Sequence, residues 1–264
     1  MNWTKKKLSE ICDVKRGKTI TLKDAIPGNI PVIGGGLKET YYHNKSNRDS
    51  NTITVSGSGA NAGYINFYEK PIFASDCTTL EVKDKSTDIL YVYFALKNLQ
   101  NWIYEKLKLG AAQPHVYAKD IAKLEIPCPP LIEQKKIVKI LKISNDLISK
   151  RNKTIEKLNE LSQSIFTNMY EKLDDNQTCL LGDVIDIKRG GSPRPITKWL
   201  TDDKDGINWI KISDASKSDK YIYSTEQKIK KEGIKMSRYV KNGDFILSNS
   251  MSYGRPYILK TDGC

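Results

Sequence analysis

Two copies of one ten-residue motif stand far apart in the sequence, and this repeat limits the possible folds more than any other feature. Residues 8–17 read LSEICDVKRG and residues 181–190 read LGDVIDIKRG, so that Leu, Asp, Lys, Arg and Gly coincide. Two echoes follow: Val55-Ser56-Gly57-Ser58 leading to Gly63 resembles Leu247-Ser248-Asn249-Ser250 leading to Gly254, and Asp76-Cys77 weakly resembles Gly263-Cys264. A period this long indicates two copies of a domain and not a solenoid of short repeats.

The segment 131–173, between the two copies, contains neither glycine nor proline. This predicts one continuous helix of roughly 60 Å, at 1.5 Å of rise per residue. In the best heptad frame most seam positions are apolar; the frame is Ile137, Leu141, Ser144, Ile148, Arg151, Ile155, Leu158, Ser162, Ile165, Met169 and Lys172. Such a stripe must be covered by another helix. The pattern therefore favours a coiled-coil-like arm over a single helix inside a core.

The first part of the chain shows the pattern of a mixed α/β domain. Its apolar spacing predicts a helix over 89–107 and strands at 11–15, 52–56, 64–68, 79–83 and 121–126. We therefore expect an α+β fold class in three parts. A first domain occupies 1–130, the long helix occupies 131–173, and a partial second copy of the domain occupies 174–264.

The chain is strongly basic, with 43 Lys and Arg against 31 Asp and Glu, a net charge of +12 and a pI near 9.3. The excess is spread over all three parts, which fits a broad surface that faces a polyanion such as nucleic acid. A lysine-rich proteome is the alternative explanation. The mean hydropathy of −0.51 and the absence of a long apolar run indicate a soluble protein without a transmembrane helix.

The cysteines and histidines predict no metal centre. None of the five cysteines forms a C-x-x-C pair, and His43 and His115 are the only histidines; the cysteines are Cys12, Cys77, Cys128, Cys179 and Cys264. We expect neither a zinc site nor a disulfide framework. Because the N-terminus does not resemble a signal peptide, we expect a cytoplasmic location.

Two patterns suggest chemistry. Gly57 to Gly63 follow a predicted strand but precede another strand, whereas a phosphate-binding loop leads into a helix. A small-residue turn that reverses the chain or lets the backbone approach DNA is the favoured interpretation. Asp76, Glu81 and Lys83 form D-x4-E-x-K, a trio of the kind that metal-dependent nucleases use. The polar face of an ordinary strand is the alternative.

Two stretches, 41–48 and 188–194, mix cations, aromatic rings and amides, which are the groups that contact phosphates and base edges. A solvated loop explains either stretch equally well. With the polar loops near 56–61 and 113–115, they give these candidate DNA-binding residues: Lys15, Arg16, Tyr41, Tyr42, His43, Asn44, Lys45, Arg48, Ser56, Ser58, Asn61, Gln113, His115, Lys188, Arg189, Arg194, Asn249 and Arg255.

Residues 126–138 read IPCPPLIEQKKIV and lead into the predicted long helix. With residues 110–113 before it and the repeated opening that ends in Lys-Arg-Gly, this passage resembles the specificity subunit of Type I restriction–modification enzymes, over essentially the whole chain. The resemblance implies a non-catalytic subunit that binds double-stranded DNA. Two target-recognition domains each read half of a bipartite sequence, and two antiparallel helices set the spacer. Methyltransferase (M) subunits bring S-adenosylmethionine, endonuclease and motor (R) subunits bring ATP and Mg²⁺, and this chain carries no cofactor.

The resemblance also makes the long helix an assembly device, with Glu133, Gln134, Ile137, Leu141, Ile148, Ile155, Leu158 and Ile165 as the expected contacts. We expect self-association through 131–173 or capture by methyltransferase subunits. No counterpart of residues 78–172 occurs in the second copy, so we expect an incomplete second domain and a chain that does not by itself specify a full bipartite target. A metal-dependent DNA nuclease that uses Asp76, Glu81 and Lys83, and a coiled-coil scaffold, are the alternative functions.

Overall fold

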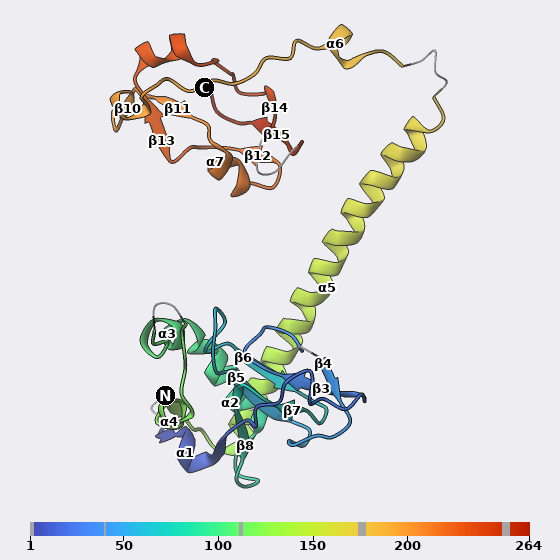
Figure 1. Ribbon diagram of the computed structural model, residues 1–264, viewed down its shortest axis with the longest axis vertical. Coiled ribbons are helices and arrows are strands. Elements are labelled where there is room, and N and C mark those ends of the chain that lie inside the picture. The colour runs from blue at the N-terminus through green and yellow to red at the C-terminus, as the bar shows by residue number, and fades with distance from the viewer. Residues whose placement is uncertain (1–2, 40, 111–112, 174–177, 250–253) are drawn as a thin grey trace. The chain divides into compact units, whose positions relative to one another are not determined.

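A computed structural model describes residues 3–39, 41–110, 113–173, 178–249 and 254–264 of the chain (Figure 1). The chain divides into two compact units, unit 1 over Met1–Phe166 and unit 2 over Thr167–Cys264. Unit 1 contains both sheets and helices together with most of the long helix, whereas unit 2 is built from short strands and short helices. The mixed fold class predicted from the sequence is confirmed.

A four-stranded antiparallel sheet forms the centre of unit 1. Its order is β2 (Cys12–Arg16), β8 (Cys77–Val82), β5 (Thr52–Ser56) and β6 (Ile65–Tyr68). A second sheet has the order β4 (Tyr41–His43), β3 (Ile30–Ile33) and β7 (Phe73–Ala74), and β1 (Lys5–Lys7) pairs with β9 (Glu125–Pro127). Every residue of β5 is buried. Since alternate side chains of a strand point to opposite faces, both faces of the sheet are covered at β5.

The helices of unit 1 build its main core. They are α1 (Leu8–Ile11), α2 (Ile89–Asn98), α3 (Gln100–Lys106) and α4 (Ala118–Ala122). Ile53, Val55 and Leu80 of the sheet belong to one apolar cluster with Leu96 of α2 and Ile103 of α3. Fully burying a side chain of this size stabilises the fold by about 1.5–3 kcal/mol. The helices α2 and α3 are therefore held against the four-stranded sheet by apolar packing.

The sequence patterns locate most of these elements correctly. The strands predicted at 11–15, 52–56, 64–68 and 79–83 are confirmed within two residues as β2, β5, β6 and β8. The strand predicted over 121–126 is wrong in its first half, where α4 ends at Ala122 before β9 begins. Ile121 and Leu124 are both buried, and their spacing of three suits a helical turn. The helix predicted over 89–107 is two helices, because the backbone leaves helical geometry at Leu99 (φ −89°, ψ 2°).

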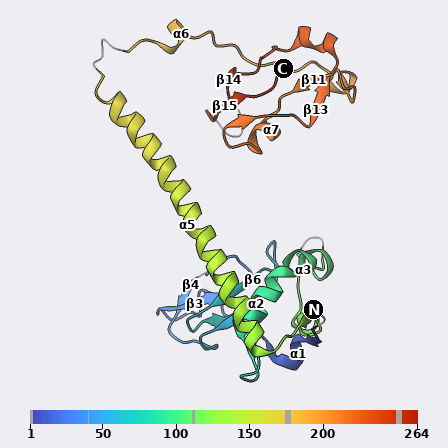
Figure 2. The same ribbon diagram turned by 180° about the vertical axis from the view of Figure 1, so that it is seen from behind.

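The long helix α5 (Leu131–Tyr170) is continuous over 40 residues, as predicted, and ends three residues before Leu173 (Figure 2). Only Gln134 and Val138 are buried, and Ile137 and Leu141 are partly buried. The core of unit 1 therefore covers only the first turns of the helix. Among the described helices, none combines the length and the apolar character that crossing a bilayer requires.

Unit 2 contains two three-stranded sheets and short helices. One sheet has the order β10 (Leu200–Thr201), β13 (Gln227–Ile229), β11 (Ile207–Trp209), and the other β12 (Tyr221–Ile222), β15 (Pro256–Leu259), β14 (Phe245–Leu247). The helices are α6 (Leu181–Val184), α7 (Ile212–Ser216) and the 3-10 helices η2 (Ile196–Lys198) and η3 (Lys231–Met236). Its small core consists of Ala215, Ile222, Tyr257 and Leu259.

The sequence repeat is visible in the backbone of α1 and α6. The residue before each helix is extended in the same way, at φ −68°, ψ 146° for Lys7 and φ −67°, ψ 140° for Leu180. The residue after each helix also agrees, at φ −129°, ψ 148° for Cys12 and φ −137°, ψ 148° for Ile185. The surroundings differ, because Leu8 is buried whereas its counterpart Leu181 is 56% exposed.

The second echo is visible as two similar hairpins, β5–β6 and β14–β15. Gly63 N–H donates to Ser56 O at 2.8 Å, and Gly254 N–H donates to Ser248 O at the same distance. Gly63 and Gly254 both have positive φ, at 89° and 71°. Ser56 therefore corresponds to Ser248, as the sequence predicted.

The weakest echo is displaced by several residues. Cys264 N–H donates to Asn208 O and Cys264 O accepts from Ile210 N–H, both at 2.9 Å, which is the pattern of a parallel pair centred on Trp209. In unit 1 the parallel partner of Val32 is Phe73. The antiparallel pair β11–β13 of unit 2 corresponds to the antiparallel pair β3–β4 of unit 1, so β11 corresponds to β3. Cys264, the parallel partner of β11, therefore corresponds to Phe73 and not to Cys77. The predicted match of Asp76-Cys77 to Gly263-Cys264 is wrong.

Candidate nucleic-acid interface

One end of the four-stranded sheet gathers polar segments that are far apart in the sequence. β2 ends at Arg16 opposite Thr78, and β5 ends at Ser56 opposite Cys77. The turn from β5 to β6 starts at the same place, because Val55 pairs with Ile65. Lys15, Arg16, Ser56, Ser58 and Asn61, which the sequence predicted as DNA contacts, therefore lie at one edge of unit 1.

The loop 57–63 in this turn is held by the segment 113–116. Gly59 N–H donates to Pro114 O at 2.9 Å, and Val116 N–H donates to Gly57 O at 3.0 Å. Ser58 and His115 are paired as an isolated antiparallel bridge. The structure thus joins Ser58 and His115, two candidate residues separated by more than fifty positions. Gln113 is exposed beside them, and residues 111–112 before it lie outside the described residues.

Two long side chains fasten the same loop from the helical side. The Lys108 ammonium donates to Ala60 O at 2.6 Å, and Gln100 Nε2 donates to Gly63 O at 2.8 Å while its Oε1 accepts from Ile65 N–H at 3.0 Å. These contacts fix the middle of the loop and its end at Gly63, while Val116 N–H holds its start at Gly57. Lys108 and Gln100 could not be predicted from the sequence, because neither belongs to a motif and their partners are 48 and 37 positions away.

The tip of the loop is open to a partner. Gly59 has a φ of 81°, and a Cβ built on it would meet no atom within 4 Å. Asn61 is half-buried, and no side-chain hydrogen bond is found for it among the described residues. A backbone without side-chain bulk, next to a free amide, suits close approach to a base edge, since Asn pairs bidentately with adenine. The strand β6 that follows the loop agrees with our rejection of a phosphate-binding loop.

Positive charge and aromatic rings surround this end of the sheet. Lys15 and Arg16 are exposed, and Lys15 lies 3.5 Å from the Asp13 carboxylate. The Lys97 ammonium lies 4.6 Å from the centre of the Tyr64 ring, and burial lowers the pKa of Lys97. The Lys108 ammonium lies 5.6 Å from the Tyr104 ring. Such pairs provide cations and stacking surfaces for a polyanion.

The stretch 41–48 divides into residues that build the fold and residues that face solvent. Tyr41 OH donates to Ile20 O at 2.7 Å, and the buried His43 accepts from Ile26 N–H through Nδ1 at 3.0 Å. Tyr42, Asn44 and Lys45 are exposed. Ser46 is exposed as well, so the side chains of residues 42 and 44–46 face solvent.

Arg48 is used entirely inside unit 1. Its Nε donates to Thr79 Oγ1 at 2.7 Å, one terminal nitrogen donates to Asn47 O at 2.7 Å, and the other donates to Arg16 O at 3.1 Å. The guanidinium therefore ties β8 to the end of β2. The sequence predicts Arg48 as a DNA-binding residue, and the structure shows three hydrogen bonds of its guanidinium within unit 1.

The predicted nuclease trio does not converge. Asp76 Oδ2 accepts from Ser58 Oγ, Glu81 Oε1 accepts from Thr52 Oγ1 at 3.4 Å, and Lys83 Nζ donates to Ser9 O at 2.5 Å. Along an extended strand, five residues separate Asp76 from Glu81 by about 16 Å. The described residues also contain no group of three His, Cys, Asp or Glu side chains placed to bind a metal ion. The geometry gives the nuclease alternative no support.

Two cysteines of unit 1, Cys12 and Cys77, are buried. Burial raises the pKa of the Cys12 thiol to about 12, and it raises that of Cys77 to about 12 as well. A thiol of this kind remains protonated at neutral pH and is a weak nucleophile. All five cysteines are free, and Cys179 is exposed.

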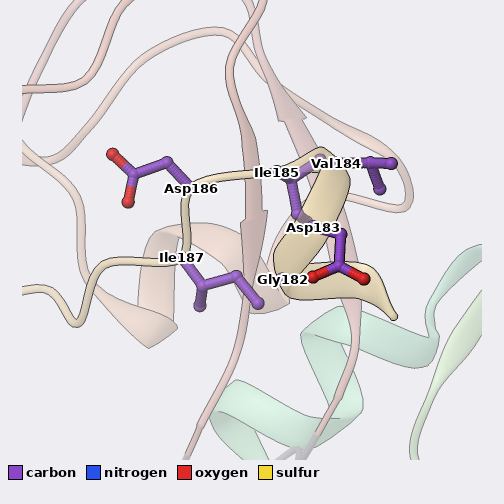
Figure 3. A pocket seen from close by; sticks show the side chains of 6 residues that line it. All are labelled: Gly182, Asp183, Val184, Ile185, Asp186 and Ile187. Atoms are coloured by element: carbon purple, nitrogen blue, oxygen red, sulfur yellow. The ribbon is translucent and has the colours of Figure 1, made fainter. Parts of the chain in front are cut away.

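The candidate residues of unit 2 are exposed but are not gathered by the fold. Lys188 pairs with Asp186 at 2.5 Å, and Arg194 and Asn249 are exposed, as is Arg189. Arg255 is exposed, and its backbone N–H donates to Ser248 Oγ at 3.1 Å; residues 250–253 of this segment lie outside the described residues. The hollow at α6 is lined only by the consecutive residues 182–187, and its side chains diverge (Figure 3). A single exposed segment provides no converging groups for a ligand.

The expected assembly residues fall into two sets. Glu133 pairs with Lys136 at 2.8 Å, and the Gln134 side chain is 1% exposed inside unit 1, so Gln134 cannot contact another chain in this conformation. Ile137 and Leu141 are partly buried against unit 1. The outer positions are more than half exposed: Ile148, Ile155, Leu158 and Ile165.

Comparisons with known proteins agree with this description. The family model described as "Type I restriction modification DNA specificity domain" matches residues 1–160. The chain is 37% identical over 124 residues to the Type I restriction enzyme MjaVIII specificity subunit of Methanocaldococcus jannaschii, covering 47% of this chain and 29% of that protein. It is 32% identical over 159 residues to the Type I restriction enzyme MpnII specificity subunit of Mycoplasma pneumoniae, covering 53% and 44%. The matched part thus spans less than half the length of these relatives.

A solved structure shares the fold. The crystal structure of a Type-I restriction-modification system S subunit from M. genitalium aligns with a TM-score of 0.54 at 22% sequence identity. The alignment covers 99% of this chain and 70% of that chain. The similarity therefore extends over both units.

Proposed function

The chain belongs to the family of Type I restriction modification DNA specificity domains, and from this premise we propose that it recognises a DNA sequence through unit 1. The observation that carries the proposal is the loop 57–63, which is fixed at both ends and open at its tip. It stands with Lys15, Arg16 and His115 at one edge of a basic domain. Cations there bind phosphates, while Asn61 and the backbone at Gly59 read the bases.

In this proposal the chain is not catalytic. It directs methyltransferase and endonuclease subunits to the target in the cytoplasm, and those subunits supply S-adenosylmethionine, ATP and Mg²⁺. The dispersal of Asp76, Glu81 and Lys83 supports this assignment over a nuclease. Purified chain incubated with DNA and Mg²⁺ is expected to leave the DNA intact, and cleavage would contradict the proposal.

The exposed stripe of α5 serves assembly. Ile148 is 59% exposed and Ile155 is 57% exposed, although both are large apolar residues of the predicted seam. A helix of a second copy, or a helix of a methyltransferase subunit, would remove this surface from water at about 25 cal/mol per Å². A coiled-coil scaffold without DNA binding is the alternative that this stripe alone would allow.

Unit 1 reads one half-site in this scheme. The loops 57–63 and 113–116 meet at the sheet end of unit 1, and this convergence supports reading by that unit. Two copies paired through α5 would place two equivalent unit 1 surfaces on one duplex and read a symmetric site. Sequencing of methylated positions in a host that carries this chain and its methyltransferase tests this expectation, and an asymmetric bipartite target would contradict it.

DNA binding is tested by titrating the full chain against a labelled duplex at several salt concentrations. Phosphate contacts make the affinity fall steeply with salt. Asn61→Ala is expected to lose about 1–3 kcal/mol of discrimination at one base position. Asn152→Ala, an exposed asparagine on α5, is the matched control. Equal affinity and equal site preference for wild type and Asn61→Ala would move the reading surface elsewhere.

Assembly is tested by replacing Ile148 and Ile155 with aspartate and measuring the mass of the chain in solution. Each new carboxylate would be buried without a partner in the seam, which opposes association. Asn152→Asp with Asn159→Asp has the same spacing and the same added charge on exposed positions of the helix, and it should associate like wild type. A wild-type chain that stays monomeric at high concentration and binds no methyltransferase would refute the role of α5.

A further inference from the structure

Asp76 occupies a special position at the sheet end, between β7 of one sheet and β8 of the other. Its carboxylate accepts a hydrogen bond from Ser58 Oγ, and its backbone O accepts from Gly57 N–H at 3.0 Å. Both partners belong to the loop 57–63. Asp76 therefore contacts the candidate reading loop through its side chain and through its backbone.

Two glycines allow the carboxylate to fit between two loops. A Cβ on Gly57 would lie 2.8 Å from Asp76 Oδ1, and a Cβ on Gly35 would lie 2.5 Å from Ser58 O and 3.4 Å from Asp76 Oδ2. Any side chain at either glycine would collide with these groups. Asp76 is thus enclosed by the loop at 34–36 on one side and the loop at 57–63 on the other.

The contacts continue from Ser58 to the second polar segment. Ser58 is bridged to His115, and Gly59 N–H donates to Pro114 O. A carboxylate at a surface that faces phosphates is electrostatically unfavourable unless it is used locally. Asp76 meets this condition, because its half-buried carboxylate accepts the hydrogen bond from Ser58 Oγ between the two loops.

We propose that Asp76 is a positioning residue for DNA recognition, which holds the loop 57–63 through Ser58 and thereby sets the placement of Asn61 and His115. The inference rests on the proposed function of unit 1. It assigns Asp76 a role through the loop and not through direct contact with DNA. A loop that loses this anchor still binds phosphates but presents its reading groups in several arrangements.

The experiment selects duplexes from a randomised pool with the full chain and then measures affinity for the preferred duplex and its single-base-pair variants. Asp76→Ala is expected to lower the selectivity between them about tenfold, the order of one base contact, with a much smaller change in affinity for unrelated DNA. Asp76→Asn keeps an acceptor for Ser58 Oγ and should retain most of the selectivity. Glu81→Gln, at the far part of β8, is the matched control and should leave it unchanged.

Hydrogen exchange distinguishes positioning from direct contact. The amides of Gly59 and Val116, which join the two segments, should exchange faster in Asp76→Ala and not in Glu81→Gln. Lost selectivity with unchanged exchange, or with Asp76→Asn as impaired as Asp76→Ala, would mean direct contact and overturn the inference. If Asp76→Ala does not fold, Ser58→Ala removes the same hydrogen bond and decides the question. Unchanged selectivity in Asp76→Ala, or in Ser58→Ala, refutes the role of Asp76 but not DNA recognition by unit 1. A wild-type chain that prefers no DNA sequence refutes the proposed function itself.

Discussion

Gln134 connects the long helix α5 to the rest of unit 1, and its replacement by leucine should destabilise that unit strongly. Its Oε1 accepts from Asp88 N–H at 2.9 Å, and its Nε2 donates to Pro129 O at 2.8 Å. Asp88 is also the N-cap of α2, where its Oδ1 accepts from Leu90 N–H and Tyr91 N–H. One buried amide therefore joins the first turns of α2 and α5.

The magnitude follows from the two groups that lose their partner. A leucine fills nearly the same volume but leaves Asp88 N–H and Pro129 O without hydrogen bonds, and each unmade bond in a buried place costs about 1–3 kcal/mol. The added apolar surface of leucine offsets part of this loss. We expect Gln134→Leu to lower the free energy of unfolding of unit 1 by about 2–4 kcal/mol, a large fraction of the usual 5–15 kcal/mol.

The assay is urea unfolding of the full chain, followed by hydrogen exchange of core amides in unit 1 so that unit 2 does not contribute. Gln163→Leu on the exposed part of α5 is the matched control, and it should change stability by less than about 0.5 kcal/mol. Gln134→Glu keeps the acceptor, loses the donor and buries a charge, so its stability loss should grow between pH 5 and pH 8. If Gln134→Leu were as stable as Gln163→Leu, the two buried hydrogen bonds would not be what holds α5 to α2.

Three further outcomes are expected. Arg48→Ala should lower the free energy of unfolding, measured by urea titration, by about 1–3 kcal/mol, because three hydrogen bonds are lost. A variant that stays stable but loses DNA selectivity would instead indicate that Arg48 contacts DNA. Gly63→Ala should be far more destabilising than Gly59→Ala in the same titration: both have positive φ, but only at Gly63 would a Cβ meet a side chain, at 2.9 Å. Burial raises the pKa values of Cys12 and Cys77 to about 12, so these thiols ionise at a lower pH in the unfolded chain than in the folded chain. The free energy of unfolding should therefore be unaffected below pH 9 and should fall by up to about 1.4 kcal/mol per thiol and pH unit toward pH 12. A flat alkaline stability profile would contradict this cause.

The features that the sequence predicted correctly are those set by local pattern. A segment without glycine or proline and with heptad spacing has one low-energy conformation, so the continuity of α5 follows from its residues alone. The hairpin of β5 and β6 follows in the same way from alternating side chains and the glycines between them. The motif 8–17 was also recognised because its copy at 181–190 keeps the same side chains and the same backbone turn.

The roles of individual polar residues could not be predicted in this way. Composition identifies Tyr41, His43 and Arg48 as able to bind DNA, but their hydrogen-bonding partners in the fold lie 21, 17 and 31 positions away along the chain. A side chain that satisfies a buried backbone group inside the domain has the same sequence signature as one that waits for a ligand. Gln134 shows the opposite case. The resemblance to the family predicts that it contacts another chain, but its side chain is buried and bonds Asp88 and Pro129 of the same unit.

The two copies of the repeat separate what a motif determines from what its surroundings determine. Residues 8–11 and 181–184 adopt the same short helix with the same entry and exit, so this conformation is local. In unit 1, Leu8 N–H donates to Leu124 O and β2 then pairs with β8, which buries Leu8 and Cys12. In unit 2, residues 185–190 belong to no described strand, and Leu181, Val184 and Ile187 are exposed. The motif thus determines the short helix and its turn, while pairing with β8 determines the burial of Leu8 and Cys12.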